Sequence, residues 1–326
     1  MAVNDSLAAL ADTAFTGSVV VYSVAVVGFA GEYAFGRRGR VARTSEEQTA
    51  TAVGGSDRAG TATATAVGSG QRLGALGLGC TVIGAALQVL SLVLRGVATD
   101  RVPWGNMFEF ACAAVLVTVL SFLWLVWQAP AFRHIGVFVL IPALFVLVYA
   151  GLILYAEAEP LVAALRSYWL AIHVAAAITA TGIFMLSFVV TVLYLIRQRY
   201  ERGVIEDGAM PRAIAGLGPR LPTAAVLDRL SYRTVAFAFP IWTFAVIAGA
   251  IWAESAWGRF WGWDPKETWA LIAWLVYACY LHARATAGWK GVKAARINLL
   301  GFFAMTFNFL IVNMVVSGLH SYSGLT

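Results

Sequence analysis

The stretch IGVFVLIPALFVLVYAGLILY, residues 135–155, carries no charged side chain along its whole length. A helix of this length, rising ~1.5 Å per residue, crosses the ~30 Å hydrocarbon core of a bilayer. The rest of the chain is similar, because 60% of its 326 residues are hydrophobic, 12% are charged and the mean hydropathy is +0.77. We therefore expect an all-α, polytopic integral membrane protein with about eight transmembrane helices, at residues 14–35, 72–95, 106–128, 135–155, 169–196, 234–254, 268–287 and 297–319.

The basic residues predict how these helices are oriented, because Lys and Arg are retained on the cytoplasmic side. With the N-terminus outside, most of the 23 basic residues fall in inner segments. The outer side keeps only Arg95, Arg101, Arg166, Arg259 and Lys266. We therefore expect both termini outside. The net charge of +6 is explained by this topology and gives no indication of a nucleic-acid partner.

The composition divides the chain into three expected regions. Residues 1–43 carry the first helix, which we expect to be a retained N-terminal transmembrane helix, because no basic n-region or clear cleavage site precedes it. Residues 44–71 are rich in Ala, Thr, Gly and Ser, which predicts a flexible cytoplasmic linker. Residues 72–326 are then the transmembrane core.

A tryptophan-rich segment, WGRFWGWDPKETW at residues 257–269, follows the sixth expected helix. Asp264, Pro265 and Glu267 have the spacing of a capping box, which predicts that a helix begins there. In the expected topology this segment is an outer loop.

The tryptophans of this loop can be interpreted in two ways. Indole rings collect at bilayer surfaces, so they could form an interfacial belt. Their density exceeds what a belt requires and favours a platform for a flat, apolar ligand such as heme, a quinone ring or a lipid headgroup. The candidate residues are Trp257, Trp261, Trp263 and Trp269.

The four histidines help to choose among these ligands, because imidazole is a common ligand of heme iron and an ionisable group in a membrane helix is a functional candidate. His173 and His320 belong to different helices and are both expected at the outer surface, where they could supply two axial ligands. The alternative is that both are interfacial histidines with a structural role.

His282 is expected near the inner leaflet, because it follows Pro265 by roughly 26 Å of helix. It is either a helix-end histidine or a ligand of a second, deeper site whose other ligand comes from elsewhere. His134, beside Arg133 in a short inner loop, is expected to be structural or solvated.

The loop resembles the tryptophan-rich "WWD" signature of heme-handling proteins of cytochrome c biogenesis. PWGNMFE at residues 103–109, WLAIHV around His173 and SGLHSY around His320 are similar to the CcsA/ResC branch, also called CcsB. The likeness covers most of residues 103–326, whereas the N-terminal third matches loosely.

The resemblance implies a subunit of the System II cytochrome c synthetase, a heme lyase of the bacterial plasma membrane whose active face is extracytoplasmic. Such proteins work with a ResB-type membrane subunit, present heme b outside and support its thioether attachment to the CxxCH motif of apocytochrome c. A thiol-reducing thioredoxin-like protein would be a further partner, and membrane lipid surrounds the subunit.

Carried over by position, His173 and His320 match the outer axial ligands and His282 matches the transmembrane heme site. The heme platform corresponds to Trp257, Trp261, Trp263, Asp264 and Trp269. No catalytic acid or base is implied, because orienting the macrocycle edge toward the incoming thiols is the main task.

Two rival functions remain from the sequence. A heme transporter without ligation activity is compatible with the same residues. An electron-transfer subunit with two b-type hemes fits less well, because it would need four intramembrane histidines and only three are suitably placed.

Overall fold

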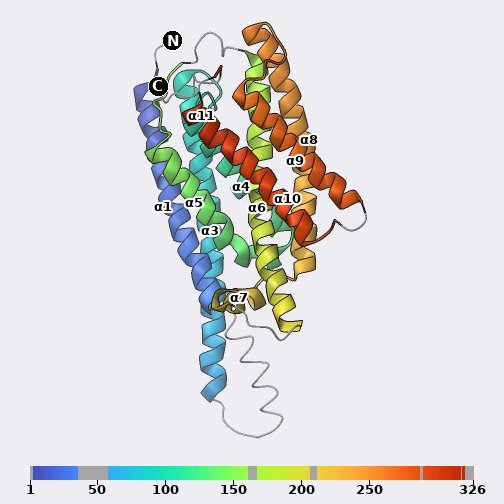
Figure 1. The fold of residues 1–326 in the computed structure, drawn as a ribbon. Helices are drawn as coiled ribbons and strands as arrows, with labels where there is room; N and C mark the ends of the chain where they lie inside the picture. The colour runs from blue at the N-terminus through green and yellow to red at the C-terminus, as the bar shows by residue number, and fades with distance from the viewer. Residues whose placement is uncertain are drawn as a thin grey trace.

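The computed structural model describes residues 3–35, 58–160, 167–205, 211–286, 289–316 and 318–319. All regular structure in these ranges is helical, which confirms the all-α prediction. Figure 1 shows long helices that run along a common axis, with α10 crossing them obliquely and the short α7 lying across the lower end. Helix α1 begins at the upper end of this bundle.

The long helices are α1 (Asp5–Phe35), α3 (Arg58–Thr99), α4 (Met107–Gln128), α5 (Gly136–Leu152), α6 (Tyr168–Ile205), α8 (Ala224–Trp257), α9 (Pro265–Ala285) and α10 (Val292–Phe307). The shorter segments are the 3-10 helices η1 (Pro130–Ile135) and η3 (Gly218–Arg220), the α-helices α7 (Arg212–Leu217) and α11 (Asn313–Val315), and the π-helical turn η4 (Asn308–Val312).

Seven helical segments of the described chain are long and apolar enough to cross a membrane, so the protein is a multi-pass membrane protein. They are Asp5–Phe35, Gly70–Thr99, Met107–Gln128, Pro130–Leu152, Tyr168–Val204, Ala224–Trp257 and Val292–Val315. The sequence predicted about eight, and the difference is α9. This helix is 21 residues long, but tryptophans, tyrosines, His282 and Arg284 make it less apolar than the other seven.

The linker predicted at residues 44–71 differs from the structure in its second part. Helix α3 begins at Arg58, so residues 58–71 are helical. The physical reason is that this stretch is rich in alanine, the residue with the highest helix propensity, and continues directly into an apolar span. Residues 44–57 lie outside the described part of the chain.

Helices α1 and α3 pack closely along their length. Their backbones approach closely at Gly28, where an added Cβ would stand 2.9 Å from the Cα of Gly77. Small residues allow this approach, which is how helices in a membrane gain packing contacts. Tyr22 donates to Gln88 Oε1 at 2.8 Å, and Gln88 Nε2 donates to the Cys112 carbonyl at 2.8 Å, which ties α1 and α3 to α4.

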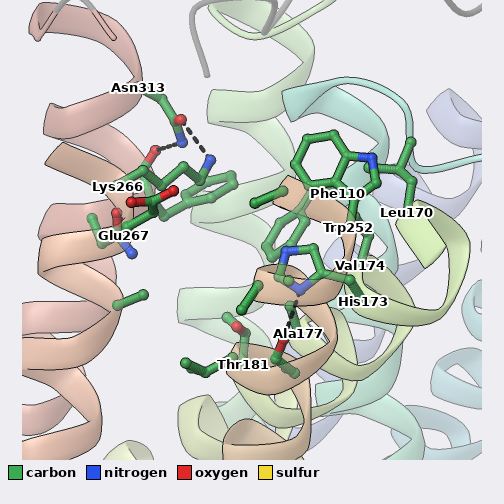
Figure 2. A pocket seen from close by; sticks show the side chains of 18 of the residues that line it. Phe110, Leu170, His173, Val174, Ala177, Thr181, Trp252, Lys266, Glu267 and Asn313 are labelled. Carbon is green, nitrogen blue, oxygen red and sulfur yellow. Dashed lines mark hydrogen bonds between the residues drawn. The ribbon is translucent and has the colours of Figure 1, made fainter. Parts of the chain in front are cut away.

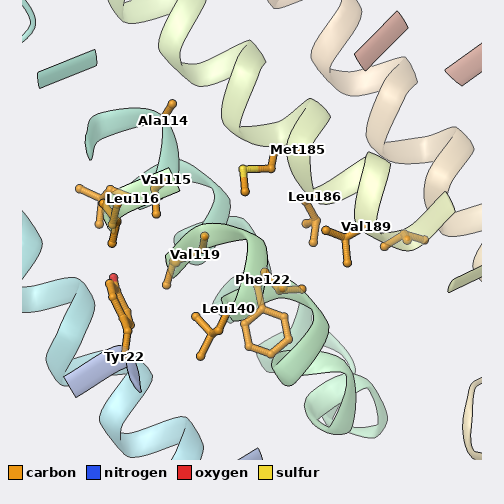
Figure 3. Packing of buried hydrophobic residues seen from close by; sticks show 14 of the residues in the cluster. Tyr22, Ala114, Val115, Leu116, Val119, Phe122, Leu140, Met185, Leu186 and Val189 are labelled. Carbon is orange, nitrogen blue, oxygen red and sulfur yellow. The ribbon is translucent and has the colours of Figure 1, made fainter. Parts of the chain in front are cut away.

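The larger apolar core lies among α1, α3, α4, α5 and α6. In Figure 3, Val119 and Phe122 of α4, Leu140 of α5 and Met185 of α6 point into the same interior. This half of the molecule contains no residue of the tryptophan loop and acts as a scaffold.

A second core lies among α6, α8, α9 and α10, where Phe184 stacks on Tyr277 with ring centroids 3.8 Å apart. A buried polar cluster lies within it, because Asn298 Nδ2 is 3.0, 2.7 and 3.0 Å from the hydroxyl oxygens of Ser187, Thr191 and Ser231 and can donate to two of them at a time. These hydrogen bonds fix α10 against α6 and α8 and so set the geometry of the helices that carry the candidate site.

Candidate functional site

At the end of the bundle where α9 begins, the helices of the second core surround a cavity of about 180 Å³. It is lined by the loop before α4 and by α4, α6, α8, α9, α10, η4 and α11. Its aromatic and polar lining consists of Trp104, Asn106, Phe110, His173, Thr181, Trp242, Trp252, Trp257, Phe260, Trp261, Lys266, Glu267, Asn308, Phe309 and Asn313.

His173 lies on the cavity face of α6, where Ala177 and Thr181 follow it at helical spacing. Its Nδ1 is 2.8 Å from the carbonyl oxygen of Ala245 on α8. Because a carbonyl oxygen only accepts, Nδ1 carries the hydrogen and the lone pair is on Nε2. This tautomer is the one in which Nε2 can bind a metal.

The backbone of α8 is shaped around this imidazole. A Cβ added at Gly249 would stand 2.7 Å from His173 Cε1, so only glycine allows the ring to lie against the helix. On its other side the ring stacks on Trp252, with centroids 6.3 Å apart and planes 7° apart. Figure 2 shows His173 and Trp252 together on one side of the cavity.

Tryptophans form much of the remaining wall. Trp252 is only 2% exposed and meets Trp257 edge to face, with centroids 4.8 Å apart. Trp257 and Trp261 reach the cavity from the end of α8 and the following loop, and Trp104 reaches it from the loop before α4. A wall of this kind suits a flat, π-rich molecule.

Three buried polar atoms around the cavity have no hydrogen-bond partner among the described residues. They are the indole N–H groups of Trp104 and Trp242 and the Oδ1 atom of Asn308. Trp242 is 7% exposed and Asn308 is 6% exposed. Because an unpaired buried polar group is costly, each of these atoms is a candidate contact for a ligand.

The start of α9 confirms the predicted capping box. Asp264 Oδ2 accepts from the Lys266 backbone N–H at 3.2 Å, and Glu267 Oε2 accepts from the backbone N–H groups of Asp264 and Gly262 at 3.1 and 2.9 Å. Asp264 Oδ1 also accepts from the Leu319 N–H at 2.7 Å. Asp264 therefore holds the C-terminal segment against the tryptophan loop.

Lys266 projects from the first turn of α9 into the cavity, before the apolar span predicted at residues 268–287. Its Nζ donates to Asn313 Oδ1 at 2.6 Å. Burial lowers the pKa of Lys266 to about 8, and the charge of Asp264 opposes this shift only in part.

The cavity does not include every candidate residue. Of the predicted platform, Trp257 and Trp261 line it, whereas Trp263 is 68% exposed and has a left-handed backbone with a φ of 58°. Trp269 packs on Phe307 of α10, with centroids 4.2 Å apart. Asp264 is buried as the helix cap and is not part of the lining.

The described residues likewise place only part of the candidate histidine set at the cavity. His282 is exposed on α9 and does not line the cavity, so the structure does not bring it to His173. His320 lies outside the described residues. The part of the chain that is described therefore brings one of the three candidate ligands, His173, to the cavity.

Sequence reasoning missed Trp242, Trp252, Gly249, Lys266 and Asn308 as lining residues. Trp104 and Asn106 belong to the PWGNMFE motif, which the sequence distinguishes only by its family resemblance. The signal for the others was weak, because Trp242, Gly249 and Trp252 are spread along α8, and only tertiary packing brings them to Lys266 of α9 and Asn308 of η4.

Fold and site together define a class of protein. It is a polytopic helical membrane protein in which several helices surround a tryptophan-lined cavity with one oriented imidazole. Residues 104–320 match the family described as Cytochrome C assembly protein, and this chain belongs to that family. The matched region begins with Trp104 and contains the whole cavity lining.

Several curated relatives are named "Cytochrome c biogenesis protein CcsA". The protein of Guillardia theta is 35% identical over 264 residues, covering 77% of this chain and 86% of that protein. That of Gloeobacter violaceus is 34% identical over 301 residues, covering 77% and 87%. That of Synechococcus sp. strain JA-3-3Ab is 35% identical over 298 residues, covering 77% and 86%. The resemblance to the CcsA branch is thereby confirmed, and with it a role in cytochrome c biogenesis.

Proposed function

We propose that this chain is the heme-handling subunit of a cytochrome c synthetase. It would bind heme b as a substrate in the cavity, present it on the extracytoplasmic face, and support thioether attachment to the CxxCH motif of apocytochrome c. The observation that carries the proposal is the imidazole of His173, which the Ala245 carbonyl orients within a tryptophan-walled cavity of a cytochrome c assembly protein.

The chemistry of the lining fits this substrate. Imidazole is a strong ligand for heme iron, and flat aromatic walls match a macrocycle. At about 180 Å³ the cavity is smaller than the ~300–1,000 Å³ of pockets that enclose a whole ligand. The cavity would therefore hold part of the macrocycle and leave another edge outside, where thiols of a second protein can reach it.

The residues of the chain would act by positioning. Attachment adds a cysteine S–H across a vinyl C=C bond, so that sulfur bonds to one carbon and the hydrogen ends on the other. No proton is gained or lost overall, so no protein acid or base is required. His173, fixed by Ala245 and Trp252, would set the plane of the substrate, and the tryptophans would exclude water from the bound part.

The other candidate residues keep the roles that the family resemblance implies. His320 would be the second outer axial ligand, close in sequence to Leu319, which Asp264 binds. His282, exposed on α9, would contribute to a transmembrane heme site with a ligand from a ResB-type partner. Trp263 and Trp269 would contact the substrate or the apocytochrome at the rim of the loop.

A thioredoxin-like protein would be a further partner and would keep the apocytochrome thiols reduced.

The test is co-expression with a ResB-type subunit and a CxxCH reporter in a host without its own attachment system. We expect covalent heme on the reporter, loss of attachment in His173→Ala, and partial recovery when imidazole is added. His134→Ala, which removes a histidine outside the cavity, is the matched control. Unchanged attachment in His173→Ala would refute the ligand assignment.

The same assay separates the rival functions. A transporter without ligation activity would deliver heme to the outer side and leave the reporter without thioether bonds. An electron-transfer subunit would retain stoichiometric heme through purification and show reversible redox changes without any dependence on the reporter.

A further inference from the structure

Lys266 is a cation that faces the cavity and forms no ion pair with an acidic side chain among the described residues. Its Nζ donates to the neutral amide of Asn313 at 2.6 Å. None of the ion pairs found among the described residues includes it. In Figure 2, Lys266 and Asn313 lie on the side of the cavity opposite to His173 and Trp252.

The two neighbouring carboxylates serve the backbone. Glu267 Oε2 accepts from Gly262 and Asp264, and both oxygens of Asp264 accept from backbone N–H groups. They are held as helix caps, and the charge of Asp264 compensates the ammonium of Lys266 only in part. The lowered pKa of Lys266, caused by burial, agrees with a charge that lacks full compensation.

Two further donors line the same cavity. The indole N–H groups of Trp104 and Trp242 are buried and donate to no acceptor in the described part of the chain. Together with the ammonium of Lys266 they place three donor groups in the cavity wall, beside acceptors that include Asn308 Oδ1 and the Glu267 carboxylate. A carboxylate, which only accepts, matches such a set.

We propose that Lys266 is a substrate-orienting residue that binds a carboxylate of the ligand, in the case of heme a propionate group. This inference rests on the proposed function. Because His173 is on the opposite side, the iron and the carboxylate would be held from two directions. The propionate edge would then point into the cavity, and the vinyl-bearing edge would be left toward the incoming thiols.

The experiment compares heme with heme dimethyl ester, in which both propionates are neutral. Each is titrated spectroscopically into the purified full-length protein and into Lys266→Met, Lys266→Arg and Lys293→Met. Lys293 is exposed in the first turn of α10, does not line the cavity and is the matched control. We expect the wild type and Lys293→Met to bind the free acid about 10 to 100 times more tightly than the ester.

Lys266→Met should bind both forms with similar affinity, and Lys266→Arg should recover most of the preference because it restores the charge. The Soret position should stay unchanged in Lys266→Met, since His173 is intact. The thermal midpoint of each variant shows whether it is folded. If Lys266→Met is not folded, the comparison of acid with ester in the wild type carries the test.

The outcomes separate the two proposals. Heme binding by the wild type with the same acid preference in Lys266→Met overturns the orienting role alone, as does a wild type that binds acid and ester equally. A wild type that binds neither form overturns the proposed function together with this inference.

Discussion

At the scale of single residues, the site depends on how closely α8 approaches the imidazole of His173. Gly249 leaves no room for a side chain, and Ala245 offers its carbonyl to Nδ1. Both are small residues on one face of α8. The imidazole is therefore held by backbone geometry, which is stiffer than a contact between two flexible side chains.

Gly249→Ala tests this arrangement. The new Cβ would stand 2.7 Å from His173 Cε1, so the ring must move or the helices must separate. We expect overpacking of about 1–3 kcal/mol and reduced heme retention after purification. Gly79→Ala in α3 is the control, because a Cβ there meets nothing within 4 Å. Equal heme retention in both variants would contradict the proposed role of Gly249.

The loop tryptophans show what sequence can and cannot predict at this scale. The capping box was predictable because Asp264, Pro265 and Glu267 interact within one helical turn. The direction of Trp263 was not, because it follows from a positive φ at that residue, which a count of nearby tryptophans does not reveal. Trp263 therefore points outward while Trp261, two residues earlier, lines the cavity.

At the scale of elements, a buried charge cluster joins α1, α3 and α4. Arg95 is 1% exposed and lies 3.2 Å from both Glu109 and Asp12, and Arg101 donates to Glu109 at 2.7 Å. Glu109 Oε2 also accepts from the Gly105 N–H at 2.8 Å, directly after Trp104 in the cavity wall. The cluster thus couples the scaffold to the loop that lines the cavity.

Glu109→Gln should be strongly destabilising, because it removes the carboxylate charge between Arg95 and Arg101. We expect a loss of about 3–5 kcal/mol, seen as a lower thermal midpoint in detergent. Glu254→Gln, at an exposed position on α8, should change the midpoint little. Similar midpoints in the two variants would show that the charge cluster does not stabilise the fold.

The outward face of α9 offers a second test at this scale. Leu275, Cys279 and His282 are exposed along it, whereas Cys112 in α4 is buried. In variants that retain one cysteine each, we expect a maleimide to label Cys279 in detergent and to leave Cys112 unlabelled. If a ResB-type partner covers this face, co-purification should protect Cys279. Labelling of Cys112 at the same rate would contradict the packing of α4.

Most spans were predictable because a long apolar run has few alternatives to a membrane helix. The cavity was not predictable as a whole, because Trp104, Trp242 and Trp252 are each unremarkable within their own helices or loops. They become a site only when α4, α6 and α8 pack, and that packing depends on contacts such as Asn298 with Ser187. Local patterns carry no information on such contacts.

At the scale of the whole molecule, the orientation of the cavity in the membrane depends on whether α9 crosses it. This helix is less apolar than the other seven long segments, yet it must cross if the cavity and the basic segment after it are to lie on opposite sides. Its packing against α8 and α10 explains how it can cross, because Tyr277 and Tyr280 are buried and Arg284 pairs with Asp228 at 2.7 Å.

Two single-cysteine variants in a cysteine-free background test the crossing directly. Trp263→Cys and Lys293→Cys replace exposed residues on either side of α9. A membrane-impermeant maleimide added to intact cells should label position 263 and not position 293, and permeabilised cells should label both. Labelling of both in intact cells would mean that α9 does not cross. Labelling of position 293 alone would reverse the orientation that the basic residues predict, and would place the cavity and His173 on the cytoplasmic side.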